Sequence, residues 1–384
     1  MRFLKADRLF DGKHFLADDL VLVLDRGNEF KDLVPEKDLE KGIIERFEGI
    51  LSPGFVNAHC HLELSHLHNK ISKHSGLPEF GKSVIQLRDQ FRKEEIAEHM
   101  EEADAAMWRS GIVVVGDISN DATSFRQKTR GSIFYHTFLE LIGLNPQRSR
   151  SVFEKGESLL ETLKNMELRS SAVPHAPYST STDLISLCAE FDDTHNLPFS
   201  IHNQESEEEN KFFEGKHSKF EKLYEFLHLD ISWFKSTGGS SLEAYASHLS
   251  KRPSLLVHNT FTREKDLASV RDKNVYWCFC PGANQYIENS LPDFTLFAKQ
   301  KGKICVGTDS LASNTQLDLI QEVNVILRSG SVFSEEDLLA AITGNAAEAL
   351  MLEDQFGNFI AGKNTGLNLV SRKNSELKFI KKIA

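Results

Sequence analysis

The stretch that decides the fold is SPGFVNAHCH, which runs from Ser52 to His61. Its apolar residues are typical of a buried strand, which we expect over Gly54–Ala58. His59 and His61 follow at once, and side chains at i and i+2 of an extended segment point to the same face. Both imidazoles can therefore reach one metal ion, and we predict that a metal site starts at the end of this strand.

Outward from this stretch, short β-branched or aromatic runs alternate with longer amphipathic runs, a pattern typical of βα units around a parallel sheet. The expected strands are Gly54–Ala58, Ile112–Val115, Ser132–Leu141, Arg169–Val173, Phe199–His202, Ser254–His258, Val275–Cys280 and Lys303–Gly307. The expected helices include Glu94–Arg109, Ser151–Asn165, Asp183–Phe191 and Glu336–Met351. Eight units predict an α/β fold, a (β/α)8 TIM barrel over residues 53–351. The 384 residues suffice, since such barrels need about 250.

The two ends of the chain have a different pattern. Residues 1–52 alternate apolar and polar residues in short bursts, at Val21–Leu24 and Gly42–Phe47, with Asp-Gly and Gly-Asn turn signals that are typical of hairpins. Residues 352–384 return to such runs at Leu367–Val370. We expect both segments to pack together as one small, discontinuous β-sandwich domain.

Composition limits the partners and the compartment. A net charge of −11 disfavours nucleic acid and anionic membranes as partners, and leaves a small-molecule substrate as the expectation. No apolar run reaches the ~20 residues of a membrane span, and no signal-peptide core is present, so we expect a cytoplasmic protein. The five cysteines are expected to be buried thiols rather than disulfides. The oligomeric state is open between a monomer and a homodimer.

Polar residues at the ends of barrel strands are the informative ones, because catalytic groups of this fold lie there. The fifth strand ends in His202 with Glu205 close behind, the sixth ends in His258, and the eighth is followed by Asp309. Together with the first-strand histidines they form a nitrogen and oxygen ligand set that suits zinc with one position left for water. Iron, nickel and manganese are alternatives for the same ligands.

The chain also contains further histidines and one partial motif. Eight further histidines are expected to be surface or packing residues: His66, His68, His74, His136, His195, His217, His228 and His248. His61-Leu-Glu63 matches half of the nucleobase deaminase signature, but the P-C-x-x-C half is missing, because Cys278-Phe-Cys280 has the wrong spacing. No P-loop, Rossmann glycine motif or serine-hydrolase elbow is present.

These residues resemble the amidohydrolase superfamily, in particular its deaminase and chlorohydrolase branch, including the aminodeoxyfutalosine, adenosylhomocysteine and guanine deaminases. The matching stretches span nearly the whole chain in the order of the family. They are Ser52–His61, His175-Ala-Pro-Tyr-Ser179, His202-Asn-Gln-Glu205, His258, Cys280-Pro281 with Asn284, Gly307-Thr-Asp309, and Gly362-Lys363 before Leu367–Leu369.

The resemblance implies a mononuclear site in which one divalent metal ion is bound by His59, His61, His202 and Asp309. Glu205, His258 and Asp309 then have catalytic roles. A bound metal lowers the pKa of a water molecule toward ~7, which supplies a hydroxide nucleophile. Asp309 and His258 hold its proton, and Glu205 protonates a ring nitrogen of the substrate.

Binuclear members of the superfamily use a carboxylated lysine at the end of the fourth strand. This chain has Val173, Pro174 and His175 there, which disfavours a dihydroorotase or hydantoinase. His175 resembles a family histidine that contacts purine-like substrates. The loop that starts at Ser310 and includes Asn314 resembles that of deaminases of adenosine-like nucleosides. Glu63 is expected to contact ribose hydroxyls, with packing of the first loop as the alternative.

The predicted function is hydrolytic removal of an exocyclic amine, as ammonia, from a purine-like heterocycle or nucleoside, with an adenosine-like compound such as aminodeoxyfutalosine as the preferred substrate. The alternatives are a chlorohydrolase or an amide-type hydrolase of the same superfamily. A metal-holding barrel without enzymatic activity is a third alternative, against which the acid and base beside the predicted metal site argue.

Overall fold

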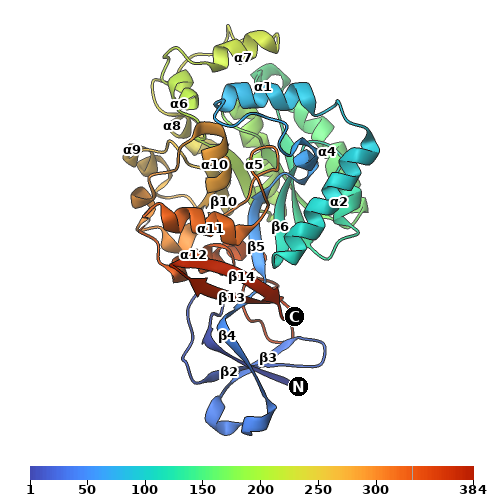
Figure 1. Ribbon diagram of the computed structural model, residues 1–384. Coiled ribbons are helices and arrows are strands. Elements are labelled where there is room, and N and C mark those ends of the chain that lie inside the picture. Colours follow the sequence, from blue (N-terminus) through green and yellow to red (C-terminus); the bar gives the residue numbers. More distant parts are fainter. Residues whose placement is uncertain (331) are drawn as a thin grey trace.

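Two four-stranded parallel sheets form the centre of the molecule in the computed structural model, which describes residues 1–330 and 332–384. One sheet has the order β5-β6-β7-β8 and the other β12-β11-β10-β9 (Figure 1). The strands are β5 (Phe55–Cys60), β6 (Ile112–Ser119), β7 (Phe134–Leu141), β8 (Arg169–Pro174), β9 (Phe199–Asn203), β10 (Ser254–His258), β11 (Val275–Phe279) and β12 (Ile304–Val306). All eight strands expected from the sequence are confirmed, with ends that differ by a few residues.

The two sheets share one apolar cluster. Most of its buried strand side chains come from alternate positions along seven of the eight strands: Val56, Ala58, Val114, Ile118, Phe138, Val173, Leu255, Val257, Tyr276, Cys278 and Cys305. Alternate residues of a strand point to one face, so these faces of both sheets lie against a common interior.

Contacts also join the outer strands of the two sheets. The backbone N–H groups of Thr308 and Asp309, just after β12, donate to the carbonyl of His59 in β5 at 3.0 and 3.1 Å. At the other edge, the N–H of His202 in β9 donates to the carbonyl of His175, just after β8, at 3.0 Å. These hydrogen bonds join the two sheets near the carboxyl ends of their edge strands.

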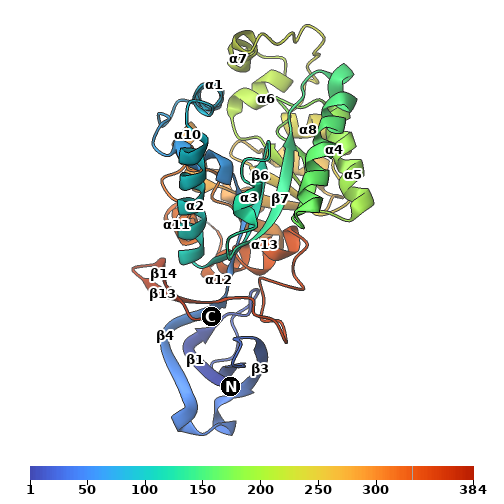
Figure 2. The same cartoon turned by 90° about the vertical axis from the view of Figure 1, so that its right-hand side faces the viewer.

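Helices surround these sheets (Figures 1 and 2). They are α1 (Leu77–Leu87), α2 (Lys93–Arg109), α3 (Phe125–Lys128), α4 (Ser149–Asn165), α5 (Thr182–His195), α6 (Glu207–Phe213), α7 (Phe220–Phe226), α8 (Ser241–Tyr245), α9 (Glu264–Leu267), α10 (Pro281–Glu288), α11 (Leu319–Arg328), α12 (Glu335–Ala341) and α13 (Gly344–Ala349). Helices α1 and α7 lie at the upper end of the molecule in Figure 1, beyond the carboxyl ends of the strands.

The prediction of a single helix over Glu336–Met351 was wrong, because the chain forms α12 and α13 instead. The carbonyl of Ile342 accepts the N–H of Val56 at 2.8 Å, and the N–H of Gly344 donates to the carbonyl of Gly12 at 3.1 Å. These tertiary hydrogen bonds use backbone groups at the break between the two helices. Backbone groups at the break therefore bond to other parts of the fold instead of continuing a helix, and the amphipathic pattern alone does not reveal this.

Strands from both ends of the chain form a single six-stranded sheet at the lower end of the molecule in Figure 1, in the order β14-β13-β4-β1-β2-β3. Its strands are β1 (Arg2–Leu9), β2 (Leu20–Leu24), β3 (Phe30–Pro35), β4 (Ile44–Pro53), β13 (Leu367–Lys373) and β14 (Glu376–Lys382). β13 pairs antiparallel with β4, so the C-terminal segment is hydrogen-bonded to the N-terminal one. The sandwich packing expected for this part stays a prediction.

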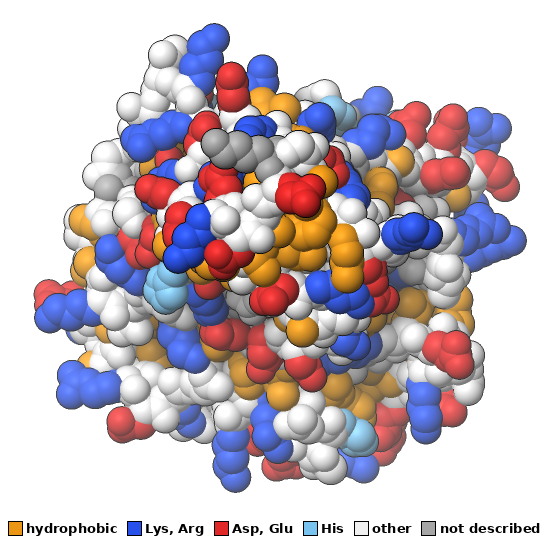
Figure 3. Space-filling view, turned by 90° about the horizontal axis from the view of Figure 1, so that it is seen from below, with side chains coloured by type: hydrophobic (Ala, Val, Ile, Leu, Met, Phe, Trp, Pro, Cys, Tyr) orange, Lys and Arg blue, Asp and Glu red, His pale blue; other side chains and the backbone are white. Residues whose placement is uncertain are grey.

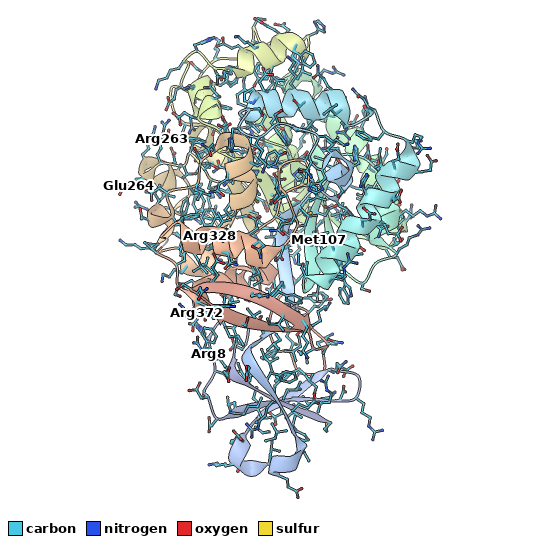
Figure 4. The ribbon with its side chains drawn as sticks, in the orientation of Figure 1. Arg8, Met107, Arg263, Glu264, Arg328 and Arg372 are labelled. Atoms are coloured by element: carbon cyan, nitrogen blue, oxygen red, sulfur yellow. The ribbon has the colours of Figure 1, made fainter. Side chains whose placement is uncertain are left out.

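Ion pairs connect this sheet to helices α11 and α12. Glu335 lies 3.2 Å from Arg8 and 3.5 Å from Arg372, and Arg328 lies 2.9 Å from Glu376 (Figure 4). All three arginines are largely exposed, so each pair stabilises the fold by less than about 1 kcal/mol. Acidic and basic side chains are interspersed over the face seen from below (Figure 3).

The described residues include no helix long and apolar enough to cross a membrane. All five cysteines are free and buried, as expected from the sequence. The cytoplasmic location and the homodimer stay predictions.

A half-buried lysine in β14 makes the stability of the fold depend on pH. The Nζ of Lys382 lies over the ring of Trp108 without a hydrogen-bond partner, and burial lowers its pKa to about 7. Between pH 7 and about 10.5, the usual pKa of lysine, the unfolded chain therefore binds more protons than the folded one. We expect the free energy of unfolding to rise with pH across this window.

Denaturant unfolding at pH 7 and pH 10 measures this rise, and Lys382→Met should remove part of it while stabilising the protein at pH 7. The exposed residue Lys378 on the same strand, replaced in the same way, is the control. An identical pH dependence in the wild type and in Lys382→Met would contradict the prediction.

Candidate metal and catalytic site

Three histidines meet at the carboxyl ends of the strands. The Nε2 of His61 lies 3.1 Å from the Nε2 of His59 and 3.2 Å from the Nε2 of His202. All three side chains are nearly inaccessible to solvent. Three imidazole nitrogens that face one another in a buried space can hold one cation between them. We call His59, His61 and His202 the imidazole cluster.

The protonation of the cluster favours metal binding. The Nδ1 of His202 is 2.8 Å from the carbonyl oxygen of His175, so it carries the proton, and the lone pair of Nε2 faces the cluster. Burial lowers the pKa of His202 to about 4 and places the pKa values of His59 and His61 well below their usual range. Neutral imidazoles are the form that binds metals. The donor set therefore fits a divalent cation such as zinc.

Asp309 completes this group from the end of β12. Its Oδ1 lies 3.8 Å from the Nε2 of His59 and 3.5 Å from the Nε2 of His61, while its Oδ2 accepts a hydrogen bond from Ser313 at 2.7 Å. Gly307 allows this approach, because a Cβ there would lie 2.7 Å from the backbone oxygen and from the Cβ of His59. The sequence predicted that His59, His61, His202 and Asp309 act together, and the structure brings them together.

Glu205 and His258 form a second pair beside the cluster. The Oε2 of Glu205 lies 3.6 Å from the Nε2 of His258, whose Nδ1 donates to the Oδ1 of Asn284 at 2.8 Å. Asn284 therefore orients the ring so that Nε2 faces Glu205 and Asp309. Burial lowers the pKa of His258 to about 4 and raises the pKa of Glu205 well above its usual range. Such an arrangement suits a neutral base beside a proton-carrying acid.

Four residues at or next to the site have a left-handed backbone conformation, as several residues elsewhere in the chain also have. Gln204, His258, Asn259 and Asp309 all have positive φ, at 45°, 77°, 58° and 55°. Non-glycine residues adopt this conformation only where their surroundings hold them in it, and such positions gather at active sites. At Gln204 the buried carboxylate of Glu209 does so, since it accepts the N–H groups of Gln204 and Glu205 at 3.0 and 3.3 Å. Glu209 thereby fixes the turn that carries Glu205.

A pocket of about 440 Å³ opens onto the site. Its polar end contains His61, His202, Glu205, His258 and Asp309. Apolar side chains from α1, α7 and the segments that follow β7 and α7 line the remainder: Leu77, Phe80, Val84, Ile142, Leu144, Leu223, Leu227 and Leu229. A large concave, mainly apolar pocket with a few convergent polar groups is the usual form of a small-molecule site.

The residues expected to contact substrate divide into two groups. His175 and Ser310 line the pocket, whereas Glu63 and Asn314 are not among its lining residues. The amide nitrogen of Asn314 donates to the carbonyl of Thr308 at 2.9 Å and to Glu322 at 2.8 Å, so its donors are used within the protein. The structure therefore gives no support to substrate contact by Glu63 or Asn314.

Sequence reasoning missed several polar residues that do line the pocket, among them Arg88, Asn120 and Glu140. Glu140 is the last but one residue of β7, and a carboxylate at a strand end is the signal that pointed to Asp309. The same search for polar residues at strand ends could have found Glu140. None of the eight histidines expected to be surface or packing residues is among the described residues that line the pocket.

Residues 50–383 match the model of the amidohydrolase family. The chain belongs to this family. Within it, an adenosine deaminase from Helicobacter pylori is 27% identical over 327 residues, which are 83% of this chain and 78% of the relative. An aminodeoxyfutalosine deaminase from Nitratiruptor is 23% identical over 96% of this chain and 91% of the relative.

Among solved amidohydrolase structures, the aminofutalosine deaminase of Helicobacter pylori in complex with methylthio-coformycin superposes with a TM-score of 0.80 at 22% identity, covering 97% of this chain and 93% of that one. The zinc complex of atrazine chlorohydrolase from Arthrobacter aurescens superposes with a TM-score of 0.75 at 15% identity, covering 96% and 86%. These similarities show an α/β fold with parallel sheets that this amidohydrolase shares with them.

Proposed function

We propose that this amidohydrolase is a metal-dependent deaminase that removes the exocyclic amine of an adenosine-like nucleoside as ammonia. One observation carries the proposal: the imidazole cluster with Asp309 lies directly beside the Glu205–His258 pair at the polar end of a large pocket. The relatives named as adenosine and aminodeoxyfutalosine deaminases support the same reaction.

The fold that carries this site is a closed (β/α)8 barrel over residues 53–351. The apolar cluster shared by both sheets supports closure, as do the hydrogen bonds between β5 and β12 and between the ends of β8 and β9. Residues 1–52 and 352–384 form the discontinuous β domain, supported by the pairing of β13 with β4.

One divalent metal ion is held by His59, His61, His202 and Asp309. When bound there, the ion would act as a Lewis acid and make a water nucleophile available at neutral pH. Zinc is the first candidate because imidazole nitrogens and carboxylate oxygens are among its preferred ligands, and iron, nickel and manganese are the alternatives. The zinc in the atrazine chlorohydrolase structure supports this choice.

The protein side chains move the protons of the reaction. Asp309 and His258 take a proton from the attacking water as its oxygen bonds to the amine-bearing carbon, and Glu205 donates a proton to the adjacent ring nitrogen. The proton held by Asp309 and His258 then goes to the amine, and the bond from carbon to the amine breaks as the remaining hydroxyl proton passes to Glu205, which leaves a carbonyl, releases ammonia and restores the acid. The distance of 3.6 Å between Glu205 and His258 supports this division of roles.

The apolar walls of the pocket exclude water from around the heterocyclic base of the substrate. His175 and Ser310 are the first candidates for contacts with this heterocycle. His175 lies next to His202, with ring centroids 4.9 Å apart. Its Nδ1 contacts the Oγ of Ser179 at 2.5 Å, which fixes the orientation of the ring.

Ammonia release by metal-loaded protein tests the function. The panel is adenosine, methylthioadenosine, adenosylhomocysteine and aminodeoxyfutalosine, and we expect turnover of at least one at typical enzymatic rates of about 1–1,000 s⁻¹. Protein stripped of metal by a chelator is the control and should be inactive. Silence of the loaded protein across the panel would contradict the deaminase proposal, and chloride release from atrazine would favour a chlorohydrolase instead.

A further inference from the structure

Glu322, in α11, is a buried carboxylate that is not among the described residues lining the pocket. Its Oε2 accepts the backbone N–H of Gly282 at 2.7 Å, and its Oε1 accepts a hydrogen bond from the side-chain amide of Asn314 at 2.8 Å. Gly282 is the second residue of α10, and Asn314 lies in the segment between β12 and α11. One carboxylate therefore joins the start of α10 to the segment that carries Asp309.

The contact with Gly282 is relayed to His258 by α10. This helix also carries Asn284, whose Oδ1 accepts a hydrogen bond from the Nδ1 of His258 at 2.8 Å. That bond determines which ring nitrogen carries the proton, and it leaves the lone pair of Nε2 facing Glu205, 3.6 Å away. Gly282 and Asn284 lie within the same helical turn, so a shift of the first moves the second. Glu322 thereby acts on the orientation of the base.

The contact with Asn314 leads to Asp309. The same amide nitrogen of Asn314 donates to the carbonyl of Thr308 at 2.9 Å, and Thr308 immediately precedes Asp309. Asp309 has a φ of 55°, a conformation that residues other than glycine keep only where their surroundings hold them in it. One side-chain ligand atom of His258 lies within 4.8 Å of one of Asp309. A common anchor at Glu322 therefore fixes these two groups relative to each other.

The surroundings of Glu322 fit an ionised carboxylate. Both of its oxygens accept hydrogen bonds from N–H groups, so a glutamine would turn its own NH2 group toward a donor. The space beside Gly282 is filled as well, because a Cβ there would lie 2.5 Å from the Oε1 of Glu322 and 2.7 Å from the Nδ2 of Asn314. The contact is thus sensitive to charge at Glu322 and to size at Gly282.

We propose that Glu322 is a positioning residue of the reaction, which orients His258 through α10 and fixes its separation from Asp309 through Asn314. This role also accounts for the buried amide of Asn314, which the sequence led us to expect at the substrate. The proposal rests on the proposed function, in which His258 and Asp309 take the proton of the attacking water. Loss of the contact should slow the chemical step and leave substrate binding nearly unchanged, because Glu322 lies outside the pocket lining.

The test compares steady-state ammonia release by metal-loaded wild type and Glu322→Gln, with a nucleoside that the wild type deaminates. We expect kcat to fall about 10- to 100-fold, the usual effect of removing a residue that orients the groups of a metal site. KM should change less than about threefold, and metal content should stay at the wild-type level. Gly282→Ala crowds the same contact without removing the charge. It has the same expectation and keeps the test decisive if Glu322→Gln does not fold.

Asp318→Asn is the matched control. Asp318 is a half-buried carboxylate at the start of α11, and its Oδ1 accepts the N–H groups of Ile320 and Gln321 at 2.9 and 3.3 Å. Asparagine caps a helix as well as aspartate does, so kcat should stay within about twofold of the wild type. An equal fall of kcat in Asp318→Asn, a wild-type kcat in Glu322→Gln or in Gly282→Ala, or a fall that comes with loss of metal would each overturn the proposal.

Nitrogen-15 NMR of the His258 ring separates this proposal from the proposed function, because it needs no turnover. The signals are identified by their absence in His258→Gln. In the metal-loaded wild type and in Asp318→Asn, we expect one tautomer, with the proton on Nδ1. In Glu322→Gln the signals should shift or broaden as the other tautomer becomes populated. That change supports the positioning role even if no variant releases ammonia, whereas an unchanged His258 spectrum overturns it even if the wild type is an active deaminase.

Discussion

Glu205→Gln is expected to lower kcat about 100- to 10,000-fold for whichever nucleoside the enzyme deaminates, with the metal retained. Glu205 is buried, and its carboxylate lies 3.6 Å from His258 beside Asp309. Glutamine keeps the size of the side chain but cannot donate the proton that the ring nitrogen requires. Steady-state kinetics together with metal analysis of the purified variant measure both expectations.

Two further variants make this result specific. Asp309→Asn should reduce metal content as well as activity, because Asp309 lies within 3.5 and 3.8 Å of two histidines of the imidazole cluster. Glu207→Gln should keep nearly wild-type kcat, since Glu207 belongs to the same acidic run but pairs with Arg263 at 2.9 Å. If Glu205→Gln alone lost the metal, Glu205 would be a ligand and its role as an acid would be wrong.

The second large effect concerns stability. Asp117 in β6 and Lys128 in α3 form an ion pair of 2.7 Å, and both side chains are fully buried. Lys128 also donates to Ser119 and Thr137, at 2.8 and 3.1 Å, and Asp117 accepts the N–H of Leu62, next to His61, at 2.8 Å. Lys128→Met leaves the carboxylate buried without its cation. We expect it to lower the free energy of unfolding by about 3–5 kcal/mol.

Denaturant unfolding measures this loss. The double variant Asp117→Asn/Lys128→Met should recover a large part of it, because asparagine still accepts the N–H of Leu62 and no unpaired charge remains. Lys301→Met removes the partner of Asp337, a pair of 2.7 Å in which the lysine is exposed, and should cost less than about 1 kcal/mol. Equal stability of Lys128→Met and Lys301→Met would contradict the argument.

The strands of the two parallel sheets could be predicted from the sequence because each strand depends on a local property of the chain. The runs that became β5 to β12 are buried along their whole length or nearly so, and this appears in the sequence as β-branched and aromatic segments bounded by polar ones. The break between α12 and α13 could not be predicted from the sequence. It depends on hydrogen bonds to Val56 and Gly12, which are remote in sequence.

The sequence by itself placed His59, His61, His202, His258 and Asp309 where predicted strands end, and the resemblance to the amidohydrolase superfamily singled out His59, His61, His202 and Asp309 among them as candidate metal ligands. Only the tertiary structure decided which other polar groups line the pocket. Glu140 and Glu63 are both buried carboxylates that accept a hydrogen bond from Asn120 through Oε2, but Glu140 lines the pocket, whereas Glu63 lies outside the lining, 3.9 Å from Arg88. Those contacts join separate loops and strands, so no local pattern encodes them.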